Sequence, residues 1–101
     1  MEEWAEEAAE QLARITREPM ADAARGTVWI ANASERRGRS RYQECALEVV
    51  AEAPDLPART VQTAVVFDSR RYWPVIGTTL PARISRTHPD MVEVDWEAAL
   101  R

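Results

Sequence analysis

The chain has 101 residues, of which 46% are hydrophobic and 30% are charged, and its net charge is −4. This composition predicts one soluble folded domain and argues against a disordered, collagen-like or coiled-coil protein. No apolar run approaches the roughly 18 residues that span a bilayer, and the N-terminus lacks the basic region of a secretory signal, so we expect a cytoplasmic protein without a membrane partner.

The N-terminal segment has the pattern of an acidic amphipathic helix. Trp4, Leu12 and Ile15 fall on one helical face, and glutamates occupy the other faces. Pro19 disfavours helical geometry in the residue before it, so we expect the helix to span residues 2–18. Its apolar stripe is narrow, and the three large apolar side chains are therefore expected to dock on the rest of the chain or to form an assembly contact with a partner.

From Gly26 onward the period of the apolar residues changes from 3.6 to 2, and β-branched and aromatic residues become frequent. This change predicts a second unit of the chain, residues 26–96, that is built from strands. Five strands are expected, and they are Thr27–Ala33, Arg41–Ala51, Arg59–Phe67, Thr79–Ser85 and Met91–Trp96.

Five short strands after one helix predict an α+β fold that is mainly β, in which an antiparallel sheet closes or nearly closes into a small barrel. The barrel is expected to be OB-like or SH3-like, and the sequence does not choose between these strand orders. Alternation in the second strand directs Leu47 and Val49 to the core, together with a buried, unpaired Cys45. Apolar residues on both faces of Arg59–Phe67 predict that this strand is covered on both sides.

The C-terminal half carries two short motifs, PVIGTTLPA from Pro74 to Ala82 and HPDMVEVDW from His88 to Trp96. Over about residues 26–96 the chain resembles small β-barrel domains of unknown function that are common in actinobacterial genomes. The resemblance implies the barrel fold and brings no activity with it. The chain departs from the usual pattern where His88-Pro89-Asp90 replaces a simple Asp-Pro turn.

All thirteen cationic side chains are arginines, and two expected connections are rich in them. In an antiparallel meander, the connections after the first and third strands emerge at the same end of the sheet. This end is the predicted contact surface, with Arg36, Arg37, Arg39, Arg70, Arg71, Tyr72 and Trp73 as its contact residues. The other end is expected to carry Glu52, Asp55, His88 and Asp90.

Two binding functions fit arginines that alternate with aromatic residues. A protein partner, or a second copy of the chain, is the main prediction, because Arg, Tyr and Trp are enriched at interface hot spots. Single-stranded nucleic acid is the alternative, and the acidic net charge argues against it. A purely structural interpretation also exists, in which the connections are ordinary charged loops, Trp73 fills one end of the barrel and the acidic helix covers the arginines.

Enzyme chemistry has little support in the sequence. His88 is the only histidine and precedes a proline in an expected turn, so it is a remote candidate for a catalytic residue. One histidine and one cysteine provide no metal-ligand spacing, and the three glycines form no phosphate-binding loop. We therefore expect a binding module without enzymatic activity, cofactor or metal.

Overall fold

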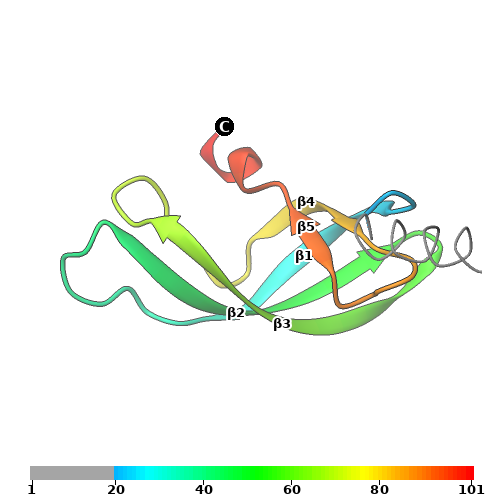
Figure 1. Ribbon diagram of the computed structural model, residues 1–101, viewed down its shortest axis with the longest axis horizontal. Coiled ribbons are helices and arrows are strands. Elements are labelled where there is room, and N and C mark those ends of the chain that lie inside the picture. The colour runs from blue at the N-terminus through cyan, green and yellow to red at the C-terminus, as the bar shows by residue number, and fades with distance from the viewer. Residues whose placement is uncertain (1–19) are drawn as a thin grey trace, which may run out of the picture.

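A computed structural model describes residues 20–101, which form five strands and one short helix (Figure 1). The predicted helix over residues 2–18, with Trp4, Leu12 and Ile15, lies outside the described residues. The elements are β1 (Ala24–Ala33), β2 (Tyr42–Ala53), β3 (Leu56–Asp68), β4 (Thr79–Ile84), β5 (Val92–Val94) and the 3₁₀ helix η1 (Trp96–Leu100).

The strands form where apolar residues alternate with polar ones, because successive side chains of a strand point to opposite faces of the sheet. In β2 the prediction for Leu47 and Val49 is confirmed, since both are buried. Cys45, two residues before Leu47 in the same strand, is also fully buried. Val28 and Ile30 of β1 meet them in the core and are also inaccessible to solvent. The alternation in these two central strands therefore creates most of the hydrophobic core.

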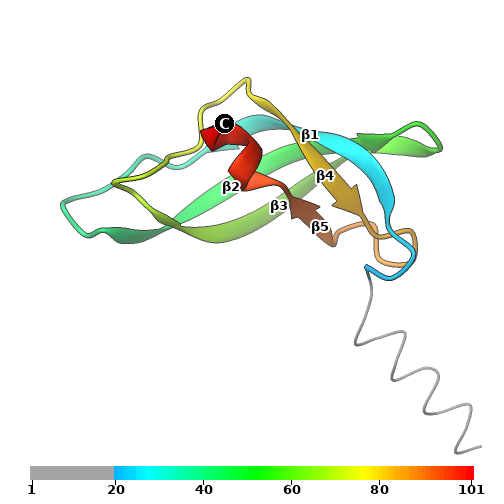
Figure 2. The same ribbon diagram turned by 90° about the horizontal axis from the view of Figure 1, so that it is seen from above.

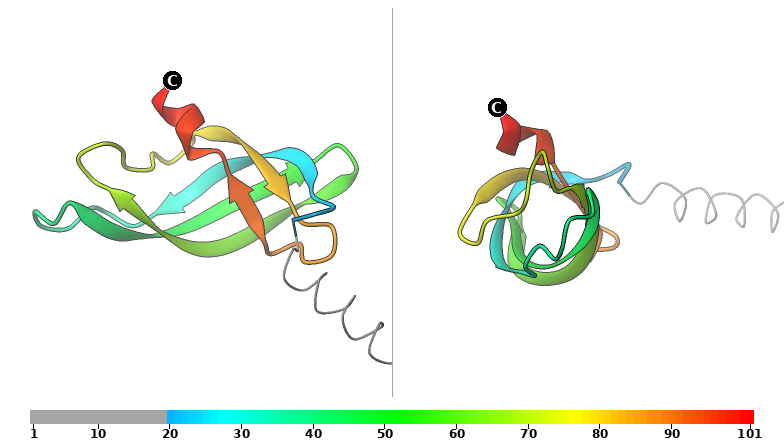
Figure 3. Two further views of the ribbon diagram at one scale, coloured as in Figure 1. Left: turned by 45° about the horizontal axis from the view of Figure 1, so that its top comes forward. Right: turned by 90° about the vertical axis from the view of Figure 1, so that its left-hand side faces the viewer.

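The sheet has the order β3-β2-β1-β4-β5, and every neighbouring pair is antiparallel. Figure 3 shows that the five strands curl around a common axis, so the described part of the chain is a mainly β, curled half-barrel. The expected closure is absent among the described residues, because β3 and β5 stand at the two ends of the sheet without a ladder between them. The expected meander is also corrected, because β4 does not pair with β3, the strand before it, but with β1.

The long connection between β3 and β4 explains how the chain reaches the other side of β1. Its last residues extend the β1 ladder, because the Gly77 N–H donates to the Ile30 carbonyl at 2.8 Å and the Ile30 N–H donates to the Thr78 carbonyl at 2.9 Å. Gly77 has φ of 93°, a conformation that favours glycine. The turn at Gly77 thus places β4 in register beside β1.

Strand β3 is covered on one face only, which corrects the expectation of two covered faces. Val61 and Phe67 are buried on the core side, whereas Val66 on the outer side is 61% exposed. The apolar residues on the outer face of β3 are therefore surface residues. The outer residues Gln62, Ala64 and Val66 are all exposed, so no described element packs over this face.

The last strand is shorter than expected because the chain turns into η1. The Asp95 side chain accepts a hydrogen bond from the Ala98 N–H at 3.2 Å and caps the helix. Trp96 then packs edge-on against Phe67 of β3, with ring centroids 4.9 Å apart. In Figure 2, η1 lies beside the connection between β3 and β4. The contact of Trp96 with Phe67 joins the two edges of the half-barrel through side chains.

Candidate functional site

The two arginine-rich connections lie at the same end of the sheet, as Figure 1 shows. They are residues 34–41 between β1 and β2 and residues 69–78 between β3 and β4, and together we name them the arginine pole. Direct hydrogen bonds join them. The Ser69 N–H donates to the Arg41 carbonyl at 2.6 Å, and the Ser69 hydroxyl donates to the Ser40 carbonyl at 2.9 Å.

Two further hydrogen bonds extend this link toward the start of the first connection. The Trp73 indole N–H donates to the Ser34 carbonyl at 3.0 Å, and Arg36 donates through Nη1 to the Ser69 carbonyl at 2.7 Å. Because a buried or half-buried backbone carbonyl needs a donor, these bonds satisfy groups that a loose loop would leave to water. The two connections therefore form one braced surface.

The predicted pole arginines divide into two groups by their partners. Arg36 is held by the Ser69 carbonyl, and Arg71 forms an ion pair with Glu97 of η1 at 3.6 Å. The side chains of three others form no hydrogen bond or ion pair within residues 20–101, and these are Arg37, Arg39 and Arg70, all exposed. The structure brings all five predicted arginines to one end and leaves three of them with free guanidinium groups among the described residues.

Asp68, at the end of β3, fixes the base of the pole. Its Oδ2 accepts a hydrogen bond from Arg41 Nε at 3.0 Å, and its Oδ1 accepts one from the Arg70 N–H at 3.1 Å. The hydrogen bond from Arg41 is the main reason that the pKa of Asp68 lies below its usual value. The same contact raises the pKa of Arg41, so this pair stays ionised at neutral pH.

The predicted aromatic residues of the pole face the core. Tyr72 and Trp73 are half-buried and pack against Phe67, with ring centroids 5.8 and 6.0 Å from it. The Tyr72 hydroxyl is buried without a hydrogen-bond partner among the described residues, and burial raises its pKa. The structural interpretation, in which these rings fill the end of the barrel, accounts for these contacts.

Tyr42, the first residue of β2, is an exposed aromatic residue beside the pole that the sequence analysis did not include among the predicted site residues. It is 65% exposed, and the guanidinium carbon of Arg41 lies 5.3 Å from its ring centroid. Together with Arg37, Tyr42 lines a hollow of about 460 Å³ on this end. The available signal was the alternation of β2, because a strand that directs Cys45 inward must direct Tyr42 outward.

Acidic side chains lie next to the pole on the outer face of β2. Glu44, Glu48 and Glu52 recur at even spacing on the strand, so they share the face opposite to Cys45 and Leu47. None of the three forms an ion pair with a described residue. The surface that continues from the arginine pole along β2 is therefore negative.

The opposite end of the sheet holds the turns between β2 and β3 and between β4 and β5, where Asp55 and Asp90 were predicted. Arg86 forms an ion pair with Asp55, and Arg59 forms one with Asp90 at 2.8 Å. His88 is exposed, its backbone N–H donates to the Ser85 hydroxyl at 2.9 Å, and its Nδ1 lies 3.2 Å from the Thr87 hydroxyl. These contacts order a turn.

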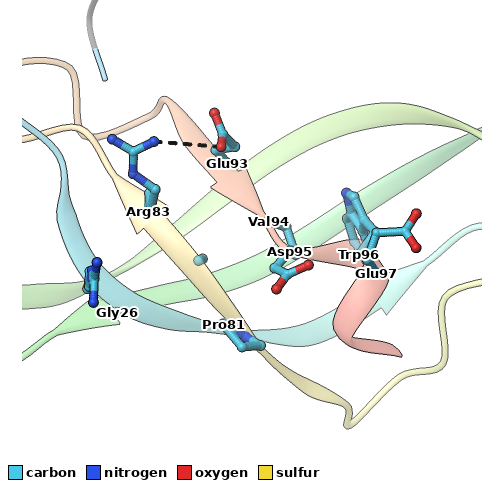
Figure 4. Close-up of a pocket in the computed structure, with 10 residues that line it drawn as sticks. Gly26, Pro81, Arg83, Glu93, Val94, Asp95, Trp96 and Glu97 are labelled. Atoms are coloured by element: carbon cyan, nitrogen blue, oxygen red, sulfur yellow. Dashed lines mark ion pairs between the residues drawn. The ribbon is translucent and has the colours of Figure 1, made fainter. Parts of the chain in front are cut away.

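A shallow groove of about 600 Å³ runs over β1, β4 and β5 on the side of the sheet shown in Figure 4. Pro81 and Trp96 provide apolar surface in it, and Arg83 and Glu93 face each other across the two strands at 3.9 Å. Glu97 at one end of the groove pairs with Arg71. The groove therefore reaches the arginine pole.

Comparisons of the chain with protein-family models, curated proteins and solved structures find no match. Within residues 20–101, no three His, Cys, Asp or Glu side chains gather as a possible metal site. The same residues contain no helix with the length and hydropathy required to cross a membrane.

Proposed function

We propose that the protein is a non-enzymatic binding module whose arginine pole contacts a protein partner. The observation that carries this proposal is the group of exposed guanidiniums of Arg37, Arg39 and Arg70, which have no partner within residues 20–101. They project from connections that are braced by Ser69 and Trp73. A braced surface loses little conformational entropy on binding, and guanidinium groups match carboxylates in fork geometry.

The charges around the pole favour a protein over a polyanion. Glu35 lies in the same connection as Arg37 and Arg39, and Glu44 and Glu48 follow on the outer face of β2. A nucleic acid that extends from the pole along β2 meets these carboxylates, whereas a protein surface can present acidic residues to the pole and basic residues to the glutamates. A protein partner with both signs of charge is therefore the best fit.

Single-stranded nucleic acid is the second candidate, and Tyr42 is the observation that favours it. Its exposed ring beside Arg41 provides a stacking platform next to cations.

We also infer that the strand order, with β1 between β2 and β4, favours the OB-like over the SH3-like alternative. OB folds bind oligonucleotides through the face of strands 2 and 3 and nearby loops, and here that face carries the glutamates of β2.

Affinity capture from cells that express the tagged full chain tests the main proposal. The variant Arg37→Glu/Arg39→Glu/Arg70→Glu is expected to lose a specific protein that the wild type retains, and a thermal melt checks that the variant is folded. Arg25→Glu/Arg83→Glu/Arg101→Glu is the control, because it changes the net charge equally at residues outside the pole. Equal retention by both variants argues against the pole as the contact surface.

Fluorescence anisotropy of labelled single-stranded DNA and RNA across a salt series tests the second candidate. Binding through four to six arginines gives a log–log salt slope of roughly −3 to −4. A slope of this size places nucleic acid first if Tyr42→Ala weakens binding and Arg37→Ala/Arg39→Ala makes the slope less steep by about 1.4. Absence of binding at low salt removes that candidate.

A further inference from the structure

The longest strand of the sheet, β3, has a free edge. It spans Leu56–Asp68 and is the first strand in the sheet order, with β2 as its neighbour. Among the described residues, the backbone of residues 56–67 forms no hydrogen bond to any element other than β2. Opposite this edge, the end strand β5 has three residues, and the two edges meet through side chains at Arg59–Asp90 and Phe67–Trp96.

The middle of β3 lacks the features that usually protect a free edge. Natural edge strands carry charges, proline or bulges that block pairing with another chain. Pro57 and Arg59 lie at the beginning of β3, but the segment 60–67, with the sequence TVQTAVVF, has no charge, proline or glycine. Its pairing with β2 shows no register shift over these residues. Such a regular, uncharged strand is a template for an added strand.

The side chains at this edge are also poorly covered. Thr63 points toward the core side with Val61 and Val65, yet it is exposed, and Val65 is half-buried. On the outer side Val66 is 61% exposed. An added strand would cover exposed side chains of β3 on both the core side and the outer side, at the point where the half-barrel is open.

We propose that β3 is a self-association edge that pairs antiparallel with β3 of a second copy, centred on Thr63. A sheet that continues across two copies requires residues of the same face to stand opposite each other, which restricts the register to alternate positions. The register centred on Thr63 meets this condition. It places Thr63 opposite Thr63, Val61 opposite Val65 and Thr60 opposite Val66 of the second copy.

The sequence of β3 complements itself in this arrangement. Val opposite Val and Thr opposite Thr are favourable cross-strand pairs. The charged residues of the strand have opposite signs at its two ends, Arg59 near the beginning and Asp68 at the end. Arg59 points to the core side and Asp68 to the outer side. Each is already paired within the chain, Arg59 with Asp90 and Asp68 with Arg41, so neither places an unpaired charge at the ends of the added strand. The pairing is isologous, as in most homodimers.

A second register, centred on Ala64, keeps the same faces but matches the side chains less well. It pairs Val61 with Phe67, but it leaves two valines on each side of the axis opposite polar residues, Val65 opposite Thr63 and Val66 opposite Gln62. The Thr63-centred register leaves one, Val66 opposite Thr60. The choice between the two registers can be measured with single cysteines, because directly opposed residues of antiparallel strands lie within disulfide distance. The native Cys45 is fully buried and gives little background.

Oxidation of the full-length variants Thr63→Cys, Ala64→Cys and Thr79→Cys tests the proposal. We expect Thr63→Cys to form a disulfide-linked dimer much more rapidly than the other two, since Thr79 is an exposed residue of β4 far from this edge in the sheet order. Dominant cross-linking of Ala64→Cys would overturn the Thr63-centred register. Equal cross-linking of Thr63→Cys and Thr79→Cys would overturn the proposal as a whole.

Light scattering coupled to size-exclusion chromatography provides the second measurement. We expect a dimer for the wild type and a folded monomer for Thr63→Lys. In this variant two like charges meet on the symmetry axis, so the dissociation constant of the dimer should rise at least about tenfold. Thr79→Lys is the matched control and stays dimeric. A wild type that is monomeric, or a dimer that Thr63→Lys leaves intact, contradicts the proposal.

The outcome is independent of the arginine pole. Arg37→Glu/Arg39→Glu/Arg70→Glu retains the β3 dimer if both proposals hold. A wild-type monomer in which the β3 amides that point away from β2 are also protected from hydrogen exchange would show that the chain covers this edge itself, and would overturn self-association.

Discussion

Arginine side chains occur at both ends of the curled sheet, but their partners differ. At the end with the turn between β2 and β3, Arg59 and Arg86 each form an ion pair with an aspartate. At the arginine pole, Arg37 and Arg39 have no such partner within residues 20–101. The two ends therefore differ in how many of their arginines are paired within the described residues, and the proposal that the pole is a contact surface rests on this difference.

The pole also rests on a different kind of support. Its second connection is held by Phe67, which is buried and contacts the rings of Tyr72, Trp73 and Trp96. The opposite end consists of the short turn between β2 and β3 and the longer connection between β4 and β5, joined by exposed ion pairs. Exposed pairs are worth about 0–1 kcal/mol each, so aromatic packing should dominate the stability of the molecule at the pole.

Phe67→Ala is expected to have the largest effect. Removing this ring leaves a cavity under the pole and should lower the free energy of unfolding by about 3–5 kcal/mol. Urea denaturation measures the change. Val75→Ala is the control, since Val75 lies in the connection that Phe67 supports and is 62% exposed, and its loss should stay near the small values of surface substitutions. Similar losses for both variants would contradict the importance of the aromatic cluster.

Two glycines, one near each end, extend the comparison. A Cβ on Gly26 would lie 2.1 Å from the Glu52 carbonyl oxygen, so Gly26→Ala forces β1 and β2 apart and should cost about 2–3 kcal/mol. Gly38 at the tip of the pole has φ of 62° and open space around it, so Gly38→Ala should cost about 1 kcal/mol from backbone strain alone. Thermal melts of both variants check this order, and a larger loss for Gly38→Ala would reverse it.

The buried hydroxyl of Tyr72 predicts a small gain. Because this hydroxyl has no partner among the described residues, Tyr72→Phe removes an unsatisfied polar group and should raise the free energy of unfolding by about 1 kcal/mol. Tyr42→Phe is the control, since Tyr42 is 65% exposed. A loss of stability in Tyr72→Phe would mean that the hydroxyl is bonded in solution.

The smallest expected effect concerns pH, and it compares one aspartate from each end. The hydrogen bond from Arg41 lowers the pKa of Asp68, and that from Arg86 lowers the pKa of Asp55. A lowered pKa in the folded state stabilises the protein above the unfolded-state value of about 3.9, and this stabilisation is lost as the pH falls through the folded-state pKa.

Melting temperatures between about pH 5 and pH 2 should therefore fall less steeply in Asp68→Asn and Asp55→Asn than in the wild type. Both side chains are at the surface, so the differences should be small. An unchanged slope in either variant would show that its ion pair contributes nothing to folding.

Much of the strand content follows from local pattern. The alternation around Leu47 and Val49 predicts that β2 is a strand and which of its side chains point inward, because period-2 burial is a local property of a strand. The pairing of β4 with β1 does not follow, because the local pattern locates this strand, beginning at Thr79, but does not show which strand it pairs with. The early end of β5 also escaped prediction, since it depends on Asp95 capping η1.

The candidate site shows the same division. Antiparallel connectivity predicts that the two arginine-rich connections share an end of the sheet, and the structure brings them together through Ser69. Which arginines lack partners could not be predicted, because this depends on where the Ser69 carbonyl and the Asp68 carboxylate lie in three dimensions. The prediction that Tyr72 and Trp73 contact a partner stays a prediction.

The affinity of the chain for a partner identified by capture is the most direct test of the difference between the two ends. Two double variants with equal loss of charge, Arg37→Ala/Arg39→Ala at the pole and Arg59→Ala/Arg86→Ala at the other end, can be compared with the wild type by biolayer interferometry. If the arginine pole is the contact surface, the pole variant should lose at least about tenfold in affinity, or 1.4 kcal/mol, and the other variant should change little. Equal losses, or a larger loss for Arg59→Ala/Arg86→Ala, would contradict this proposal.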